Sequence, residues 1–534
     1  MGVFDGLQER FFNYGKMIDS GVAIVSPQSA LKRQQARLAL RAYEAANPSR
    51  FRKATRSVGS ADQSVIPAAR SLREQARWLE ENHDLASGAL GTMVNQIIGP
   101  SGIGVEPQPK DTAGNLIESL ADDIRMVMED AGEKPEVTGQ YNDASMQRLL
   151  CRSWLRDGEF FAQKLRGNIS GLNHRTVIPF SLELLEADMV PINLDFAGGS
   201  GSTRGIEYNA WGAPIGYRVY KTHPGSSSSF IDNSELKWIP AENMLHTKMT
   251  TRIGQTRGMS VFSSVITRLD GLKDYEESEI VASRISAAMS LQINRGSADL
   301  YVPPTSSDEC DAREFKIAPG MVFDDLLPGE SVSVIESNRP NALLADFRGS
   351  MVRMVAAGMG GTYSSFAKSY EGSYSSQRQE LVEGYQSYKA FAIDFSSQFV
   401  RPLYRERLLT AIQSGEIKVP KNIDERTLFD AAYHGQAMAW IDPSKEAKAW
   451  ETLVQAGFES QEAVIRARGR TPAEVRPEII REREWAEEND LSFSSDVAAT
   501  VSQPNSPAAD DPEDDPDKPK KDEDDATQNE NTED

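Results

Sequence analysis

The apolar positions between residues 344 and 403 follow the spacing of two amphipathic helices separated by a polar stretch. Each helix repeats apolar side chains at steps of three and four residues. The first set is Leu344, Phe347, Met351, Met354, Val355 and Met359. The second set is Leu381, Tyr385, Tyr388, Phe391, Phe395, Phe399 and Leu403. Residues 360–376 between them are rich in Gly, Ser, Tyr and Lys, and this stretch exceeds the ~2–8 residues that usually join helices. The pattern predicts two long helices flanking a functional loop.

A third long helix is predicted over residues 259–290. Its apolar positions are Phe262, Val265, Ile266, Leu269, Leu272, Ile280 and Ile285. The other face carries Arg268, Asp270, Lys273, Asp274, Glu276, Glu277 and Arg284. At ~1.5 Å per residue such a helix would span ~45 Å. A helix this long and this charged usually packs against neighbours in an assembly.

The remaining patterns indicate an α+β protein. Residues 70–98 have helical spacing, and Gly99–Gly104 with Pro100 should end that helix and start a hairpin. The other expectations are helices over most of 115–170, strands over 175–250 with Gly/Ser loops at 198–205 and 225–229, and short helices over 425–490 broken at Gly457 and Gly469.

The composition is that of a soluble globular protein with polar extensions. The chain has 534 residues, 39% hydrophobic and 26% charged, which is long enough for two to four domains. No apolar run approaches the ~18 residues of a membrane span, and the first residues lack the apolar core of a signal peptide. The two cysteines, Cys151 and Cys310, offer neither a disulfide framework nor a zinc site, so we expect a reducing cytoplasm.

The net charge of −21 is unevenly distributed along the chain. Residues 510–534 hold 13 acidic residues against three lysines, whereas residues 1–60 hold ten Lys/Arg against four Asp/Glu. The basic segment is either a surface helix with a solvated face or an arm that contacts DNA, a shell or a neighbouring subunit. From about 495 the chain lacks the apolar residues needed for a core, so we expect disorder. The acidic balance argues against tight nonspecific DNA binding, because the affinity of such binding comes from Lys and Arg side chains that neutralise phosphates.

The common catalytic patterns are missing from the sequence. It contains no G-x-x-x-x-G-K-[ST] phosphate loop and no H-E-x-x-H zinc motif. The five histidines lack ligand spacing, and His246 is interpreted as ending a strand. The Asp122–Asp123 pair is interpreted as solvated surface, and the Gly-rich 198–205 as a loop. We therefore expect a protein that is not an enzyme, with no cofactor and no metal.

Several segments, in order over residues 70–400, resemble the lambda-type family of bacteriophage portal proteins. Each is weak alone, because glycine turns and alternating strands are common. The segments are MVNQIIGPSGIGVEPQP (93–109), DGEFFAQ (157–163), GIEYNAWGAPIGYRVY (205–220), HTKMTTRIGQTRGMSVFSSVITRLDGLKDYEESEI (246–280), LLPGESVSVIESNRP (326–340) and the helix–loop–helix over 338–390. Their order makes the resemblance strong.

The resemblance implies a portal fold with an α/β wing, long stem helices, a small α/β clip and a helical crown. The implied parts are a basic N-terminal arm (1–60), the first part of the wing (61–258), a stem helix (259–290), the clip (291–340) with strands near 298–303, 313–318 and 331–336, a second stem helix (341–359), a tunnel loop (360–376), a long wing helix (377–424), the crown (425–494) and a disordered acidic tail (495–534).

In function, the resemblance implies a ring, expected to be a dodecamer, that forms a channel for double-stranded DNA at one capsid vertex. Its partners would be the terminase large subunit, a head completion or connector protein, and the major capsid and scaffold proteins, with no membrane. It would occupy the virion, after assembly in the host cytoplasm. Lys368, Tyr370 and Tyr374 would touch DNA lightly, and Gly372 would let the loop shift. The sequence leaves open whether Lys273 and Arg284 line the channel or face outward.

Three alternatives come from other classes. The first is another virion structural protein, such as a connector or tail-tube component, although these are usually smaller and lack the long helix followed by a clip-like insert. The second is a metal-dependent DNA-processing enzyme that uses scattered carboxylates. The third is a cytoplasmic scaffold, which predicts elongated low-order oligomers. The role of the acidic tail also stays open between scaffold contact, repulsion of DNA and a solubilising tether.

Overall fold

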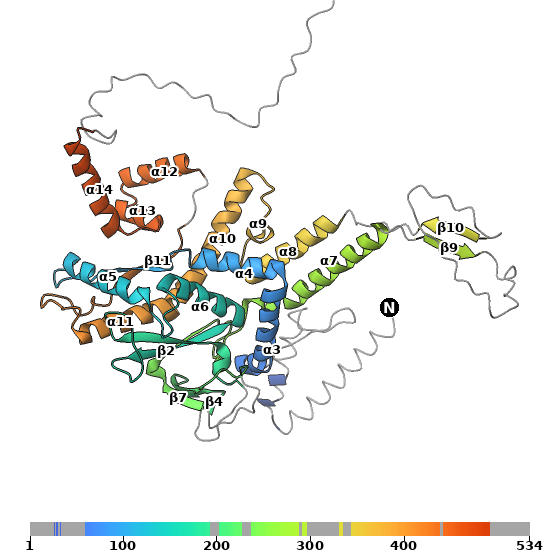
Figure 1. Cartoon of the computed structure of the whole chain (residues 1–534), viewed down its shortest axis with the longest axis horizontal. Helices are drawn as coiled ribbons and strands as arrows, with labels where there is room; N and C mark the ends of the chain where they lie inside the picture. The colour runs from blue at the N-terminus through green and yellow to red at the C-terminus, as the bar shows by residue number, and fades with distance from the viewer. Residues whose placement is uncertain are drawn as a thin grey trace, which may run out of the picture. The chain divides into compact units, whose positions relative to one another are not determined.

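The computed structural model has an α+β fold, as expected, in two compact units, Met1–Pro443 and Ser444–Asp534 (Figure 1). The residues that the structure describes are 59–192, 202–226, 236–287, 291–295, 330–334, 343–437 and 442–491, with a few positions between 26 and 33. Most of the basic N-terminal arm and the acidic tail therefore lie outside the described residues, as do the strands expected at 298–303 and 313–318.

Over residues 61–157 the structure describes four helices. They are α3 (Ala61–Asn82), α4 (Asp84–Ile97), α5 (Glu118–Glu133) and α6 (Asp143–Asp157). Ser60 and Asn142 begin α3 and α6 with capping boxes, each side chain accepting a backbone N–H three residues on. The buried face of α4 is apolar throughout, and this helix contacts both α3 and α6. The four helices enclose much of the main core.

A three-stranded antiparallel sheet follows, in the order β3-β2-β8. Its strands are β2 (Glu159–Arg166), β3 (Phe180–Leu185) and β8 (Met244–Lys248). The expectation of helix over most of 115–170 is therefore wrong at its end, where Gly158 in the left-handed conformation terminates α6 and β2 begins. Successive side chains of β2 point to opposite faces, so Phe160 enters the main core and Phe161 a second one.

That second core lies under a four-stranded antiparallel sheet in the order β4-β5-β6-β7. The strands are β4 (Ser202–Thr203), β5 (Ile206–Tyr208), β6 (Pro214–Tyr220) and β7 (Leu236–Pro240). The β5–β6 pair confirms the two strands expected within 205–220. The short helices η2 (Ala187–Met189) and η4 (Ala241–Asn243) connect the two sheets along the chain.

Strand β1 (Gly104–Pro107) does not form the expected local hairpin. It pairs with β11 (Ala431–His434), so that Gly104 lies opposite His434 across more than 300 residues of sequence. The segment that follows residue 424 is expected to begin the helical crown, with short helices over 425–490. Its first part instead closes the first unit as a strand, because Val105 and Tyr433 pack on the main core.

Helices α7 (Ile266–Ala287) and α8 (Leu344–Met359) lie side by side (Figure 1). In the chain, α7 precedes the β9–β10 pair and α8 follows it. The helix expected over 259–290 is shorter, because residues Val261–Ser264 form the 3₁₀ turn η5 capped by Ser260. Strands β9 (Leu291–Arg295) and β10 (Glu330–Val334) pair antiparallel within the segment expected to be the clip.

The long helix expected over 377–424 runs from Tyr374 to Ser414 in three consecutive parts. These are α10 (Tyr374–Phe395), the π-helical turn η7 (Ser396–Val400) and α11 (Arg401–Ser414). Phe395 at the end of α10 and Phe399 in η7 are buried, and their rings lie 5.6 Å apart. Trp154 of α6 packs on Phe395 at 5.8 Å, which fixes the long helix against the N-terminal helices.

The second unit is helical in its described part. Its helices are α12 (Pro443–Gln455), α13 (Gln461–Ala467) and α14 (Pro472–Glu488). Gly457 and Gly469, both with φ of 76°, follow α12 and α13, as the sequence predicts. None of the helices that the structure describes has the length and the apolar character that a membrane crossing requires.

Candidate nucleic-acid interface

The loop expected over residues 360–376 is more ordered than its composition predicts. Gly360, with φ of 77°, ends α8, and a short helix α9 (Tyr363–Ala367) follows. Helix α10 already begins at Tyr374, because the Ser373 side chain accepts the Ser376 N–H as an N-cap. The non-helical part of this stretch is therefore reduced to residues 360–362 and 368–373.

Helix α9 is fastened to the helices around it. Phe366 is buried in the main core, and the carboxylate of Glu380 accepts hydrogen bonds from the backbone and the hydroxyl of Ser364. The signal in the sequence was Phe366, an aromatic residue in a stretch otherwise too polar for a core. Only the segment after α9 is left to act as a loop.

The four loop residues selected from the sequence all lie in or next to this short segment. Lys368 is exposed and adopts φ of 52°, and its Nζ donates to Thr92 Oγ1 of α4 at 3.2 Å. Tyr370 and Tyr374 are 63% and 51% exposed, and Gly372 is also exposed. One ammonium group and two phenol groups are thus presented to solvent within seven residues, which suits light contact with a phosphate backbone.

The two stem residues selected from the sequence do not join this group. Lys273 lies 4.5 Å from the centre of the Trp78 ring, and its Nζ donates to the Asn82 carbonyl at 3.1 Å. This carbonyl ends α3, where the helix dipole is negative. Lys273 therefore fastens α7 to α3 in the same chain. Arg284, near the end of α7, is exposed.

The motifs D-G-E (157–159) and R-G-M (257–259) pack directly against each other. A Cβ at position 258 would come within 2.0 Å of the Gly158 carbonyl oxygen, and one at Gly158 within 2.3 Å of the Met259 carbonyl carbon. Only glycine permits this approach of two backbones. We call this contact the motif junction, and it precedes η5 and α7 in the chain.

A buried carboxylate, Glu159, holds the motif junction together. Its Oε1 accepts from Arg257 Nε at 2.8 Å and from Arg73 at 3.2 Å, and its Oε2 accepts from the Gly258 N–H at 2.9 Å and from His246 at 3.1 Å. Burial alone would raise the pKa of Glu159, but the charge of Arg257 and the bond from His246 lower it far below its ordinary range.

Arg257 is itself fully buried and donates to the carbonyls of Ala187 and Val190, which follow β3. Gln255 accepts the Thr251 N–H and donates to the Arg257 carbonyl at 2.7 Å, which fixes the turn before the arginine. The sequence singled out both motifs, and His246 with them, but not Arg73, Ala187 and Val190, which come from two other segments. His246 lies in the middle of β8 rather than at its end.

The Glu159 group leads to a pH prediction. Burial lowers the pKa of His246, and the nearby Glu159 carboxylate offsets this only in part, so the folded state favours the neutral ring. The unfolded chain binds a proton near pH ~6.5. The contribution of His246 to stability is therefore present above that pH and lost as pH falls toward the lower, folded pKa. Glu159, whose pKa is also lowered, adds a further loss below pH ~4.3.

We expect the melting temperature to fall between pH 7 and pH 5, and to fall less steeply in His246→Gln. Thermal unfolding followed by circular dichroism in buffers of equal ionic strength measures both slopes. Equal slopes in the two proteins would show that His246 does not cause the loss.

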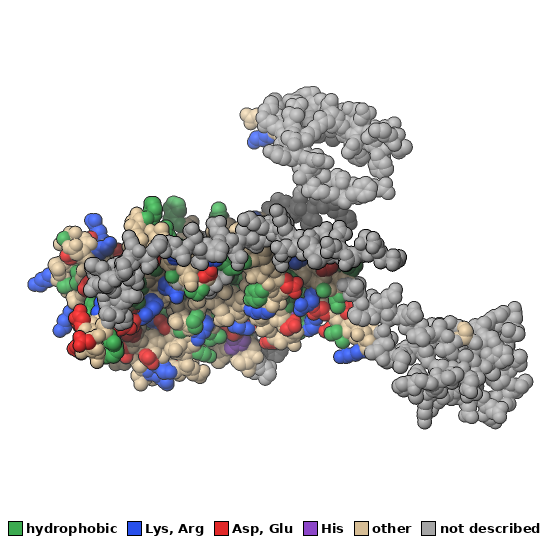
Figure 2. All heavy atoms as spheres, turned by 90° about the horizontal axis from the view of Figure 1, so that it is seen from above, with side chains coloured by type: hydrophobic (Ala, Val, Ile, Leu, Met, Phe, Trp, Pro, Cys, Tyr) green, Lys and Arg blue, Asp and Glu red, His purple; other side chains and the backbone are tan. Residues whose placement is uncertain are grey.

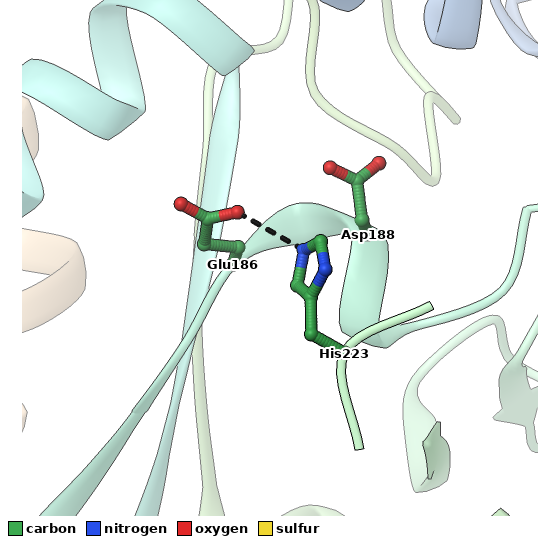
Figure 3. Close-up of side chains that lie close together, drawn as sticks. All are labelled: Glu186, Asp188 and His223. Carbon is green, nitrogen blue, oxygen red and sulfur yellow. Dashed lines mark ion pairs between the residues drawn. The ribbon is translucent and has the colours of Figure 1, made fainter. Parts of the chain in front are cut away.

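Three side chains with metal-ligand chemistry, Glu186, Asp188 and His223, lie close together at the end of β3 (Figure 3). Their distant sequence positions concealed this cluster. The Asp188 carboxylate already accepts from Arg73 at 2.7 Å and from Arg77 at 2.5 Å, and these two arginines lower its pKa against the effect of burial. A divalent cation would have to displace both guanidinium groups. The cluster is interpreted as part of the ion-pair network around the motif junction.

Charge on the described surface is mixed in sign. Figure 2 shows Lys and Arg side chains interspersed with Asp and Glu over the face that it draws. Such a surface suits sliding of a polyanion better than tight retention, because tight binding needs several basic groups that neutralise phosphates together.

Comparison with protein families decides between the alternatives. Residues 47–391 match the family described as phage portal protein, lambda family, which is more than half of the chain. The chain belongs to this family. The portal-family segment contains the motif junction, α7, α8, the loop and nearly all of α10, and it ends before β11.

Individual portal proteins show the same likeness. A probable portal protein of Halomonas phage phiHAP-1 is 26% identical over 443 residues, which are 79% of this chain and 82% of that protein. Portal protein B of Escherichia phage lambda is 25% identical over 312 residues, and the portal protein of Escherichia phage N15 is 25% identical over 309 residues. Each of these two alignments covers 52% of this chain, and 57% and 58% of the lambda and N15 proteins.

Two solved structures resemble the chain more loosely. A chain in the virion of a native gene transfer agent particle has a TM-score of 0.42 and 13% identity, covering 76% of this chain and 94% of that one. A chain in the neck of the native particle, computed with C12 symmetry, has a TM-score of 0.34 and 13% identity, covering 72% and 99%.

Proposed function

We propose that copies of this chain form a closed ring, expected to hold twelve, whose central channel carries double-stranded DNA during genome packaging and ejection at one vertex of a phage capsid. The match of residues 47–391 to the portal family carries this proposal. A cyclic ring joins two different surfaces of each copy head to tail.

In this ring the segment 368–373 with Tyr374 would line the channel. The exposure of Lys368, Tyr370 and Tyr374 supports this role, because all three can reach a duplex without leaving a core position. The anchoring of α9 by Phe366 supports it as well, since a loop with a fixed base can be short and still be held at a constant position. Gly372 would allow the tip to shift as the duplex passes.

The part over 291–340 would dock the terminase large subunit during packaging, and a head completion or connector protein afterwards. The chain itself would catalyse no reaction, and ATP hydrolysis would belong to the terminase. The wing would meet major capsid and scaffold proteins, with assembly in the host cytoplasm and the finished ring in the virion. The position of β9 and β10, between the helices α7 and α8 in the chain, supports a docking element at the end of a stem.

Negative-stain electron microscopy of the purified full chain tests the ring. Class averages viewed down the particle axis should show closed rings with a hole wide enough for duplex DNA. Because assembly can depend on a scaffold protein, a second sample is prepared by co-expression with the scaffold and capsid proteins of the same phage. Filaments or elongated low-order particles in both samples would contradict the channel.

The loop itself gives a separate prediction. Lys368→Gln should leave the melting temperature and ring formation unchanged, because the side chain is exposed and makes one hydrogen bond to Thr92. It removes one positive charge per copy from the channel, so DNA retained per particle should fall by at least about twofold. DNA content of purified particles is measured by absorbance and gel analysis.

The matched control is Lys389→Gln, the same change at an exposed position of α10 outside the loop. It should package like the unmodified chain. If both variants package equally, the channel-contact role of Lys368 is wrong even if rings form.

A further inference from the structure

Three arginines without a carboxylate partner converge on one pocket of the first unit, far in sequence from the proposed channel loop. Arg401 and Arg405 stand one turn apart on α11, and Arg426 comes from the turn before β11. The pocket has a volume of about 340 Å³. Within the described part of the chain, none of the three guanidinium groups forms an ion pair, although the chain carries a net charge of −21.

The aromatic lining of this pocket positions two of these charges. The Arg401 guanidinium lies 5.2 Å from the centre of the Tyr433 ring, and that of Arg405 lies 5.1 Å from the centre of the Phe429 ring. Stacking on a ring face holds a guanidinium plane in place while leaving its N–H groups free to bind an anion. The arrangement is therefore that of a prepared anion site rather than of mobile surface arginines.

The turn that carries Arg426 is also held in place. The backbone N–H of Arg426 donates to Asp424 Oδ1 at 3.1 Å. The carbonyl of Asp430 accepts from the N–H of Gln108, the residue that follows β1, at 2.9 Å. The pairing of β1 with β11 thus brings the turn next to α11. A pocket with a fixed lining loses little conformational entropy when a ligand binds.

The shape and charge of the pocket favour carboxylate side chains over duplex DNA. Three arginines and Asp430 line it, so the lining has a net charge of +2. A duplex presents its phosphates on the outside of a stiff rod, and such a rod does not enter a cavity of this size. Asp and Glu side chains project from a flexible backbone, and their methylene groups can contact the two aromatic rings.

We propose that this pocket binds an acidic peptide, and that its occupant is the carboxylate-rich segment 510–534 of another copy of the chain. Every copy carries this segment, with 13 acidic residues against three lysines. The last described residue, Leu491, is 19 positions before residue 510. That length of chain can span up to roughly 60 Å, which allows contact with a neighbouring molecule. The inference needs two copies but not a closed ring.

Fluorescence anisotropy with a labelled synthetic peptide of residues 510–534 tests the proposal. The receptor is the full-length chain in which the acidic residues of 510–534 are changed to Asn and Gln, so that its own segment does not compete. The peptide should bind this receptor, and it should bind the unmodified chain several-fold more weakly. A peptide with Asn and Gln at its acidic positions should not bind.

Arg401→Gln with Arg405→Gln should weaken binding at least about tenfold, because each bond to a charged group contributes measurable affinity. Arg426→Gln, which removes no aromatic contact, should weaken it as well. The control is Arg481→Gln with Arg483→Gln, the same charge change at exposed positions of α14. Melting temperatures of all variants establish that they fold.

Equal affinity in the pocket variants and the control would overturn the proposal. So would a 25-base-pair duplex that binds in a manner dependent on Arg401 and Arg405 while the peptide does not, since the pocket would then be a nucleic-acid site.

Discussion

Replacing Arg257 with Met is expected to lower the free energy of unfolding by about 3–5 kcal/mol, the usual cost of removing one partner from a buried ion pair. The guanidinium fills the space between Glu159 and the carbonyls of Ala187 and Val190. Met has a similar length but donates no hydrogen bond, so the carboxylate and the two carbonyls lose their shared donor. Guanidinium chloride denaturation followed by tryptophan fluorescence measures the change.

Two further variants separate charge from packing. Arg252→Met makes the same substitution at an exposed position five residues earlier, where the side chain donates only to the Gly59 carbonyl, and it should cost less than about 1 kcal/mol. Adding Glu159→Gln to Arg257→Met should restore part of the lost free energy of unfolding, because the double variant has no uncompensated negative charge. A loss below about 1 kcal/mol for Arg257→Met would mean that the network is not the main support of the junction.

The second large effect is expected at Gly158. Ala at this position meets two penalties, the positive φ of 87° and a contact of 2.3 Å with the backbone of Met259. Because the obstructing atoms are backbone, they cannot turn aside as a side chain would. We expect a loss of more than about 3 kcal/mol or recovery in inclusion bodies.

Gly415→Ala is the matched control. Gly415 has the same φ of 87°, but a Cβ there meets nothing within 4 Å. It should therefore cost only the conformational penalty of about 1 kcal/mol. The difference between the two melting temperatures isolates the close approach of the two motifs. Similar losses in both variants would show that backbone conformation alone explains the glycine at 158.

Helical periodicity predicted the parts of the fold that depend on local sequence. The repeats around Leu269 and Val355 correctly indicate α7 and α8, and the repeat through Phe395 and Phe399 correctly indicates the long helix. The predicted helix ends were less accurate where a single capping side chain determines the first residue, as Ser260 does for η5 and Ser373 does for α10. These caps compete with the helical pattern over one turn only, so the pattern alone does not reveal them.

Pairing between distant segments was not predictable in this way. Strand β1 pairs with β11 across more than 300 residues, and its four-residue pattern carries no information about its partner. The same reason explains the buried Arg257. An isolated arginine is usually exposed, and its burial follows from Glu159, Ala187 and Val190, which the fold alone brings together.

For the candidate interface, the sequence indicated suitable types of residue but not the direction in which each side chain points. Lys368, Tyr370 and Tyr374 are exposed, as a channel contact requires, although their role stays a prediction. Lys273 has the same chemistry on a helix of mixed charge, but it packs on Trp78. The difference lies in which neighbouring helix each side chain meets, and that depends on packing between helices rather than on their own sequences.

The π-helical turn Ser396–Val400 takes up one extra residue within the long helix. An i→i+5 turn contains one residue more than an i→i+4 turn, so α10 and α11 keep nearly the same angular relation with or without that residue. An extra residue in regular α-helix would instead rotate α10, and the loop at its start, by about 100° relative to α11. The turn therefore preserves the direction of the loop against a change of one residue in the helix. Two chains with identical loop sequences that differ by one residue at this turn would still present the same side chains along the same axis.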